Sequence, residues 1–281
     1  MTDLISVIVS TYNREDALSA VLRSLARQSD RDFEVLVADD GSGVATARVV
    51  RDWASRMPVP LRHVWHPDQG FRLAEIRNRA IRASTGAYCI FLDGDCITRS
   101  DFVAAHRRLA EPGWFVTGNR ILLSGELTER ILRVGLEPEQ WRLAEWLAER
   151  AHRHVNRFSP LLDLPLGKLR RLQARRWRGA RGSNMGFWRA DLDTVDGFDA
   201  AYSGWGREDS DIFVRMIRAN VLRKDGRFAT GVLHLWHPEA DRTRLSENER
   251  MLAEVTDSPR VRAKQGLSRV IEETSASIAH A

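Results

Sequence analysis

The sequence predicts an α/β fold: a mostly parallel, Rossmann-like sheet flanked by helices, with a helical insertion and a helical carboxyl-terminal tail. Short apolar runs alternate with amphipathic helical patterns over residues 5–92. Such an alternation implies parallel strands joined by right-handed crossover helices. In addition, 43% hydrophobic and 29% charged residues in a chain of 281 allow a sizeable buried core beneath a polar surface.

The individual elements follow from the period of the apolar residues. Short β-rich runs predict buried strands at 5–10, 33–38, 61–65 and 88–92. A helix after the first strand has on one face Ala17, Leu18, Val21, Leu22 and Leu25. A later helix shows the same spacing at Leu73, Ile76, Ala80 and Ile81. Both helices are therefore expected to cover the sheet.

The character of the chain changes after residues 114–118. An Arg- and Trp-rich stretch with a helical pattern runs over 126–178, is interpreted as an insertion, and ends in the basic run 168–178. Strands at 184–188 and 231–235 and a helix at 209–219 then return to the compact domain. The tail after Thr243 is expected to be helical and solvated.

Composition limits the class of protein. Cys89 and Cys96 form no C-x-x-C pair, so neither a disulfide scaffold nor a zinc knuckle is indicated, and a cytoplasmic setting is expected. The sequence shows no signal-peptide pattern and no long apolar span, so any membrane contact is expected to be peripheral. A net charge of +5 suits anionic partners, whether nucleotide phosphates, nucleic acid or acidic lipid.

The segment Asp93-Gly94-Asp95 directly follows an apolar strand. Two carboxylates separated by one glycine can direct oxygen ligands at one hard cation, and Mg²⁺ or Mn²⁺ can share such ligands with phosphates. Taken alone, the same segment is also typical of a polar turn. An EF-hand is excluded, because the loop lacks the required Gly and late Glu.

A second group of residues lies near the ends of the first two strands and on the third helix. Asp39 or Asp40 could accept a hydrogen bond from a nucleobase, or could cap the next helix. Tyr12 could stack on the base. Arg77 could contact phosphate oxygens, although an arginine on an amphipathic helix is often simply solvated.

Two further motifs lie near the carboxyl end. In Gly204-Trp205-Gly206-Arg207-Glu208-Asp209, one carboxylate could deprotonate a hydroxyl and the Trp face could hold a sugar, or the acids could only cap a helix. His234 and His237 are three residues apart, so both can bind one metal ion only if the chain turns there, which Pro238 favours.

Taken together, these residues resemble the family 2 glycosyltransferases of the GT-A fold. The resemblance is carried in order by 7–14 (VIVSTYNR), 35–42 (VLVADDGS), 76–80 (IRNRA) and 91–95 (FLDGD). The segments 184–188, 195–199 and 204–209 are similar to the carboxyl region shared by β-1,4-galactosyltransferases and bacterial chondroitin-type polymerases. The likeness covers 5–118 and 181–238, and indicates a bacterial polysaccharide or lipopolysaccharide enzyme.

The resemblance implies a role for each matching residue. The nucleotide-sugar site would comprise Thr11, Tyr12, Arg14, Asp39, Asp40, Arg77, Asp93 and Gly94. Asp95 would bind Mn²⁺ or Mg²⁺ together with His237 and His234, while Asp93 would contact the ribose or sugar. Asp209 would be the catalytic base beside Glu208, with Trp205 and Gly206 shaping the acceptor site. His234 stands where galactosyltransferases often have Met.

The implied activity is metal-dependent, inverting transfer of galactose or an N-acetylhexosamine from a UDP-sugar to a glycan or lipid-linked acceptor. The GT-A domain would span 1–243, with a nucleotide-sugar-binding half at 1–118, the Arg/Trp-rich insertion at 119–180 and the acceptor and catalytic region at 181–243. Residues 244–281 would form the helical tail.

Three alternatives remain open at this point. A processive polysaccharide synthase is favoured by 173–177, which fits Q-x-x-R-W, but that segment precedes the acceptor acids and no membrane span accompanies it. A nucleic-acid-binding module could use the basic run 168–181 with Trp177 stacking on a base. Nucleic acid is nevertheless not the expected partner, because the charge is confined to an insertion. A catalytically inactive sugar-nucleotide binder is the third alternative.

Overall fold

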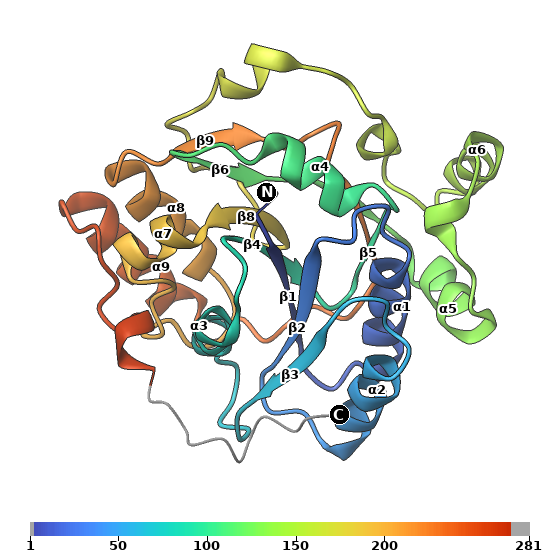
Figure 1. Cartoon of the computed structure of the whole chain (residues 1–281), viewed down its shortest axis with the longest axis horizontal. Coiled ribbons are helices and arrows are strands. Elements are labelled where there is room, and N and C mark those ends of the chain that lie inside the picture. Colours follow the sequence, from blue (N-terminus) through green and yellow to red (C-terminus); the bar gives the residue numbers. More distant parts are fainter. Residues whose placement is uncertain (1–2, 271–281) are drawn as a thin grey trace.

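The computed structural model describes residues 3–270 and centres on a seven-stranded sheet. Its strand order is β3-β2-β1-β4-β8-β6-β9, drawn across the middle of Figure 1. The strands are β1 (Ile5–Thr11), β2 (Phe33–Asp39), β3 (Leu61–Trp65), β4 (Tyr88–Asp93), β6 (Trp114–Thr117), β8 (Asn184–Trp188) and β9 (Leu222–Asp225). The first four pair in parallel, and β8 is antiparallel to both of its neighbours. The predicted, mostly parallel α/β fold is therefore confirmed.

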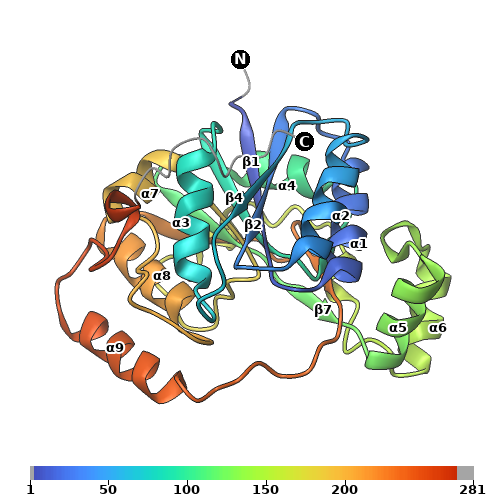
Figure 2. The same ribbon diagram turned by 90° about the horizontal axis from the view of Figure 1, so that it is seen from below.

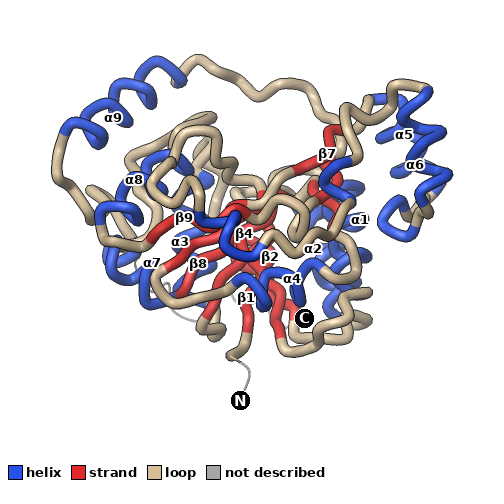
Figure 3. The backbone as a smooth tube through the Cα atoms, turned by 90° about the horizontal axis from the view of Figure 1, so that it is seen from above, coloured by secondary structure: helices blue, strands red, loops and turns tan. Residues whose placement is uncertain are grey.

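Helices cover both faces of this sheet because successive strand residues point to opposite sides. In β1, Val7 and Val9 pack in the core on one face, whereas Ile8 packs in the core on the other. The first face is covered by α1 (Glu15–Ala26), α2 (Val44–Ala54) and α4 (Phe102–Leu109). The second is covered by α3 (Leu73–Ala83), α7 (Arg189–Val195) and α8 (Glu208–Arg218). Figure 3 shows the strands enclosed between these helices.

A second, three-stranded sheet joins distant parts of the chain. Its order is β5-β10-β7, with β5 at Cys96–Thr98, β10 at Val232–His234 and β7 at Arg120–Leu122. Sequence patterning predicted β10, through the apolar run 231–235, but neither β5 nor β7. The pairing of His234 with Cys96 places the end of β10 directly beside Asp95.

The insertion is helical only in its first half. It forms α5 (Gly125–Val134) and α6 (Leu143–Ala151), which stand out from the body in Figure 2. The expected helix does not continue to 178, and this prediction was wrong. Pro160 and Pro165 remove backbone donors, and Gly167 adopts φ +50°, so only 3₁₀ turns form, including Gly167–Arg171.

The tail contains α9 (Leu245–Asp257), which confirms part of the expected helix. The tail is not solvated on all sides, because Leu252 and Val255 pack against Val214 of α8. Arg218 also donates hydrogen bonds to the carbonyl oxygens of Val255 and Thr256. The expected tail over 271–281 lies outside the described residues. Within 3–270, no helix combines the length and apolar character needed to span a bilayer.

Candidate active site

The ends of three parallel strands meet at one edge of the large sheet. Register pairs Thr11 with Asp39 across β1 and β2, and Ser10 with Asp93 across β1 and β4. The Gly94 N–H donates to the Ser10 carbonyl at 2.7 Å. A Cβ at Gly94 would lie 2.7 Å from that same oxygen, so glycine is needed there. The carboxyl ends of parallel strands are where α/β sheets bind ligands.

Asp95, His234 and His237 form a compact group at this edge. The Nε2 atom of His237 lies 3.3 Å from Asp95 Oδ2, and that of His234 lies 3.7 Å from Asp95 Oδ1. The Leu235 N–H donates to the Asp95 carbonyl at 2.9 Å, which holds the segment after β10 against the loop. One ligand atom from each of the three residues lies within 4.8 Å of the others.

The chemistry of this group fits a divalent cation. Burial lowers the pKa of His234, so its imidazole is neutral and has a free lone pair near neutral pH. The nearby Cys96 is fully buried and burial raises the pKa of its thiol, so it stays protonated and is a poor ligand. Arg120 of β7, a residue that the sequence pattern did not single out, carries a positive charge. This charge disfavours protonation of both His234 and Asp93. A mixed set of imidazole and carboxylate donors is well suited to a metal such as Mn²⁺.

Arg77 connects Asp93 at the end of β4 to Glu208 at the start of α8. Its side chain is 1% exposed and donates from Nη2 to Asp93 at 3.1 Å and from Nη1 to Glu208 at 3.4 Å. Its Nε donates to the Ser10 hydroxyl at 3.3 Å. The guanidinium therefore lies beneath the site, held between two carboxylates, rather than on the solvated face of α3.

Glu208 and Asp209 begin α8, where the helix dipole favours negative charge. The Gly182 N–H donates to Asp209 Oδ2 at 2.9 Å, and a Cβ on Gly182 would lie 2.8 Å from the Asp209 Cβ. Burial, followed by the charge of Asp209, raises the pKa of Glu208 to about 7. Asp211 is different: its buried carboxylate pairs with the buried Arg215 and faces the protein interior.

On the other side of the site, Asp39 and Asp40 are both buried and each faces a histidine. Asp39 Oδ2 lies 2.8 Å from His63 Nε2, and Asp40 Oδ1 lies 2.6 Å from His66 Nε2. Asp39 also accepts from the Ser42 N–H at 2.8 Å, but it does not cap α2, whose N-cap is Gly43 without a side-chain hydrogen bond, so the capping alternative was wrong. Sequence analysis missed both histidines, because only strand pairing places β3 beside β2.

Tyr12 projects from the end of β1 with its side chain 45% exposed, so a ring face is available for stacking. Its hydroxyl donates to Asp68 at 3.0 Å, a partner that sequence analysis also missed. Thr11 is buried at the end of β1. Arg14 precedes α1, and its guanidinium pairs with Asp16 at 3.5 Å.

The loop 203–206, which carries Trp205, contacts Arg242 and Asn248 of the carboxyl-terminal tail. Trp205 is 39% exposed, and the Arg242 guanidinium is 4.9 Å from its ring centroid. Gly206 adopts φ +99°, which only glycine does readily. Asn248 of α9 donates to the carbonyl oxygens of Ser203 and Gly206, so the tail holds this loop in place.

Known proteins resemble this chain over most of its length. The chain matches the model of glycosyl transferase family 2 over residues 6–158, and the model described as the N-terminal domain of galactosyltransferase over residues 173–235. It is 30% identical to validoxylamine A glucosyltransferase of Streptomyces hygroscopicus subsp. limoneus, covering 76% of this chain and 48% of that protein. It is 26% identical to chondroitin synthase of Escherichia coli, covering 77% of this chain and 32% of that protein. The chain thus spans about half the length, or less, of these relatives.

Solved structures show the same fold. A mannosyltransferase from Pyrobaculum calidifontis in complex with GDP-Man and Mn²⁺ superposes with a TM-score of 0.61 at 21% identity, covering 92% of this chain and 65% of that one. The S. aureus protein TarS, residues 1–349, in complex with UDP-GlcNAc superposes with a TM-score of 0.60 at 17% identity, covering 90% and 66%. At these identities, the likeness establishes the GT-A fold.

Proposed function

The chain belongs to glycosyl transferase family 2, and on that premise we propose that it is a metal-dependent, inverting glycosyltransferase. It would move a sugar from a UDP-sugar to a hydroxyl of a glycan or lipid-linked acceptor. The observation that carries this proposal is the bridge made by Arg77, which contacts Asp93 beside the cation-binding group and Glu208 beside Asp209. The proposed metal ligands and the proposed base therefore lie near one another at the strand ends, on either side of Arg77.

Asp95, His234 and His237 would hold the metal. When bound, a divalent cation would offset the negative charge that develops on the departing diphosphate. Two imidazoles in the donor set favour Mn²⁺ over Mg²⁺, which prefers oxygen ligands and retains its waters. Asp93 would contact the ribose or the transferred sugar, because Arg77 orients its carboxylate at the end of β4.

Asp209 would act as the general base. The acceptor oxygen forms a bond to the anomeric carbon while the bond from that carbon to the diphosphate oxygen breaks, and the hydroxyl proton passes to Asp209. A single displacement of this kind inverts the anomeric centre and needs no covalent enzyme intermediate. The Gly182 N–H at 2.9 Å from Oδ2 stabilises the ionised carboxylate and fixes its orientation before reaction. Glu208, protonated over part of the neutral range, would hold the acceptor beside the Trp205 face.

The donor class rests on the nucleobase side of the site and on the relatives. Exposed Tyr12 offers a stacking face, and the buried Asp39, paired with His63, lies opposite Thr11 on the neighbouring strand. A galactosyltransferase-type region over 173–235 and the chondroitin synthase relatives support galactose or an N-acetylhexosamine on UDP. The Streptomyces relatives, whose names state glucosyl transfer, make UDP-glucose the next donor to test.

The experiment is a donor screen followed by a base variant. Sugar nucleotides are tested for Mn²⁺-dependent hydrolysis and for thermal stabilisation, since a ligand that binds only the folded state raises its stability. Asp209→Asn should keep donor binding and lose transfer or hydrolysis by about 10²- to 10⁴-fold, the usual contribution of a general base. Asp257→Asn, an exposed change at the end of α9, is the matched control. Full activity in Asp209→Asn would refute the assigned base.

A further inference from the structure

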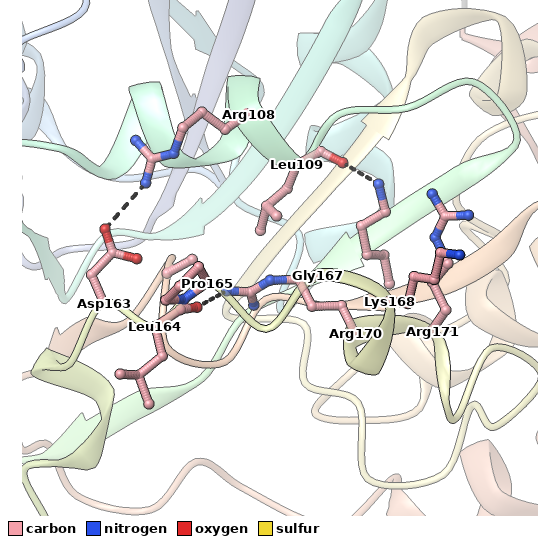
Figure 4. A pocket seen from close by; sticks show the side chains of 11 residues that line it. Arg108, Leu109, Asp163, Leu164, Pro165, Gly167, Lys168, Arg170 and Arg171 are labelled. Atoms are coloured by element: carbon pink, nitrogen blue, oxygen red, sulfur yellow. Dashed lines mark hydrogen bonds and ion pairs between the residues drawn. The ribbon is translucent and has the colours of Figure 1, made fainter.

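A cavity of 550 Å³ lies at the β9 edge of the large sheet, and it shares no lining residue with the candidate active site. Figure 4 shows its walls: the end of α4, the segment 163–171 and β9. Five of its lining residues are cationic and one is acidic: Arg108, Lys168, Arg170, Arg171, Lys224 and Asp163. The excess of positive charge predicts an anionic ligand.

The cationic side chains of the cavity differ in how far contacts within the protein already occupy them. Arg170 is buried, and its guanidinium donates to the carbonyl oxygens of Leu164, Asp225 and Arg227, so it anchors the segment to the turn after β9. Arg171 and Lys224 share Glu111. Lys168 makes no ion pair among the residues that the structure describes, and Arg108 is half-exposed in a 3.4 Å pair with Asp163. Lys168 and Arg108 are therefore the groups most available to an anion.

The 3₁₀ turn at Gly167–Arg171 separates its side chains into three directions, because residues three apart align in such a turn. Arg170 points inward. Lys168 and Arg171 line the cavity. Leu169 and Leu172 do not line the cavity, and they are 60% and 77% exposed. Two exposed leucines therefore lie beside a basic cavity, on a turn that Arg170 anchors to the protein.

The apolar and basic features continue around the turn. Leu162 and Leu164 are also exposed, as are Arg175, Arg176 and Arg178. We propose that this surface, residues 162–178 with the cavity beneath it, binds an anionic phospholipid bilayer. Headgroup phosphates would enter the cavity while Leu169 and Leu172 would insert among the acyl chains near the headgroups. Basic residues beside exposed apolar ones are the pattern that interfacial membrane segments use.

Exposed leucines favour a bilayer over the other polyanions. Single-stranded nucleic acid is held by aromatic stacking together with charge. Trp177, the aromatic residue of this surface, is half-buried against apolar side chains that include those of α8. The Arg178 guanidinium lies over its ring, 5.2 Å from the ring centroid. A soluble anionic glycan would use the cations but would leave the leucines in water.

The test is co-sedimentation of the full chain with phosphatidylcholine vesicles, with and without phosphatidylglycerol, at low and high salt. The parent should bind only the anionic vesicles, and more weakly as salt rises. Lys168→Glu with Arg175→Glu should weaken binding by at least about thirty-fold, since the loss of each cation costs about fivefold near an anionic surface and the added carboxylates are repelled. The control, Arg48→Glu with Arg51→Glu, makes the same charge change on exposed positions of α2, near the β3 edge, and should leave binding unchanged.

Leu169→Ser with Leu172→Ser completes the design, since this variant keeps every charge. Binding should fall by at least about tenfold per leucine, and urea unfolding should match the parent because both side chains are exposed. Unchanged vesicle binding in this variant, or equal loss in the α2 control, would overturn the proposal. Displacement of bound vesicles by soluble glycerol phosphate would indicate a free-phosphate site instead. Tighter binding to a single-stranded oligonucleotide, retained in the leucine variant, would indicate a nucleic-acid surface.

Discussion

Arg77 donates a hydrogen bond from Nη1 to the Glu208 carboxylate across 3.4 Å, although 131 residues separate them in the chain. The contact places a carboxylate from the start of α8 beside a guanidinium from α3. It also brings into one site the two regions that match family models, residues 6–158 and 173–235. The side chain of Glu208 is only 12% exposed, so burial and the charge of Asp209 raise its pKa, and the charge of Arg77 offsets part of that rise.

Glu208→Gln should change stability in a pH-dependent way. Burial raises the pKa of Glu208 from 4.5 to about 7, so the folded protein holds this proton more tightly than the unfolded chain does. Its contribution to stability is then complete below about pH 4.5 and is lost as the pH rises through about 7. Glutamine avoids the cost of ionisation, so the variant should gain at most about 3 kcal/mol at about pH 8 and nothing near pH 4.5.

Urea unfolding in the presence of chelator, repeated across this pH range, measures the effect. Glu129→Gln on the exposed face of α5 is the control, since it should show no pH-dependent gain. A gain of equal size at both ends of the pH range would mean that Glu208 is not the titrating group.

Removal of divalent metal should abolish sugar transfer, and Mn²⁺ should restore it better than Mg²⁺. His237→Ala should weaken Mn²⁺ binding at least about tenfold, because loss of a ligand should cost no less than loss of a supporting residue. Titration of the chain with Mn²⁺ in a calorimeter measures this directly. The exposed His152, changed to Ala, is the control. Transfer that persists after exhaustive chelation would remove the metal from the mechanism.

Tyr12→Ala should reduce affinity for the donor nucleotide by about tenfold or more, the contribution of one stacked base. Tyr12→Phe should retain most of the affinity, because it keeps the ring and removes only the hydroxyl that donates to Asp68. Calorimetric titration with UDP compares the two variants. Equal losses would show that the Asp68 contact, rather than stacking, is what binding requires.

Asp211→Asn should destabilise the protein by about 3–5 kcal/mol, since it leaves the buried Arg215 without its charge partner. Asp209→Asn, two residues earlier, should cost far less stability, because an amide oxygen can still accept from the Gly182 N–H. Urea unfolding of both variants separates the structural acid of this motif from the proposed catalytic one. Equal destabilisation by the two changes would contradict this division.

Much of the fold over residues 1–118 was predictable because its signals are local. Alternating faces in β1, β2 and β4 and the apolar stripes of α1 and α3 repeat with the period of each element. The strands at 33–38, 61–65 and 88–92 were placed to within one residue of the observed ends. Asp39 and Asp93 end their strands, and polar residues at the ends of parallel strands must share one edge of the sheet. Their proximity therefore followed from secondary structure alone.

The basic insertion shows where local pattern failed. The Arg- and Trp-rich pattern over 126–178 suggested helical structure throughout, but beyond residue 151 Arg170 satisfies backbone carbonyls of its own segment and of the turn after β9, which holds an irregular loop in place. Such a contact, made across 55 residues, leaves no periodic trace. The same holds for His63 and His66, whose carboxylate partners lie on another strand.

By itself, the sequence determined the alternating α/β architecture, the family and the residue types of the candidate site, because period and motif are properties of neighbouring residues. Only the tertiary structure decided how the acids differ: Asp93 pairs with Arg77, Asp95 faces two histidines, and Asp211 is buried against Arg215. It likewise divided the arginines of the insertion into a buried anchor and an exposed surface. Charge and burial depend on neighbours brought from distant segments, which only the folded chain provides.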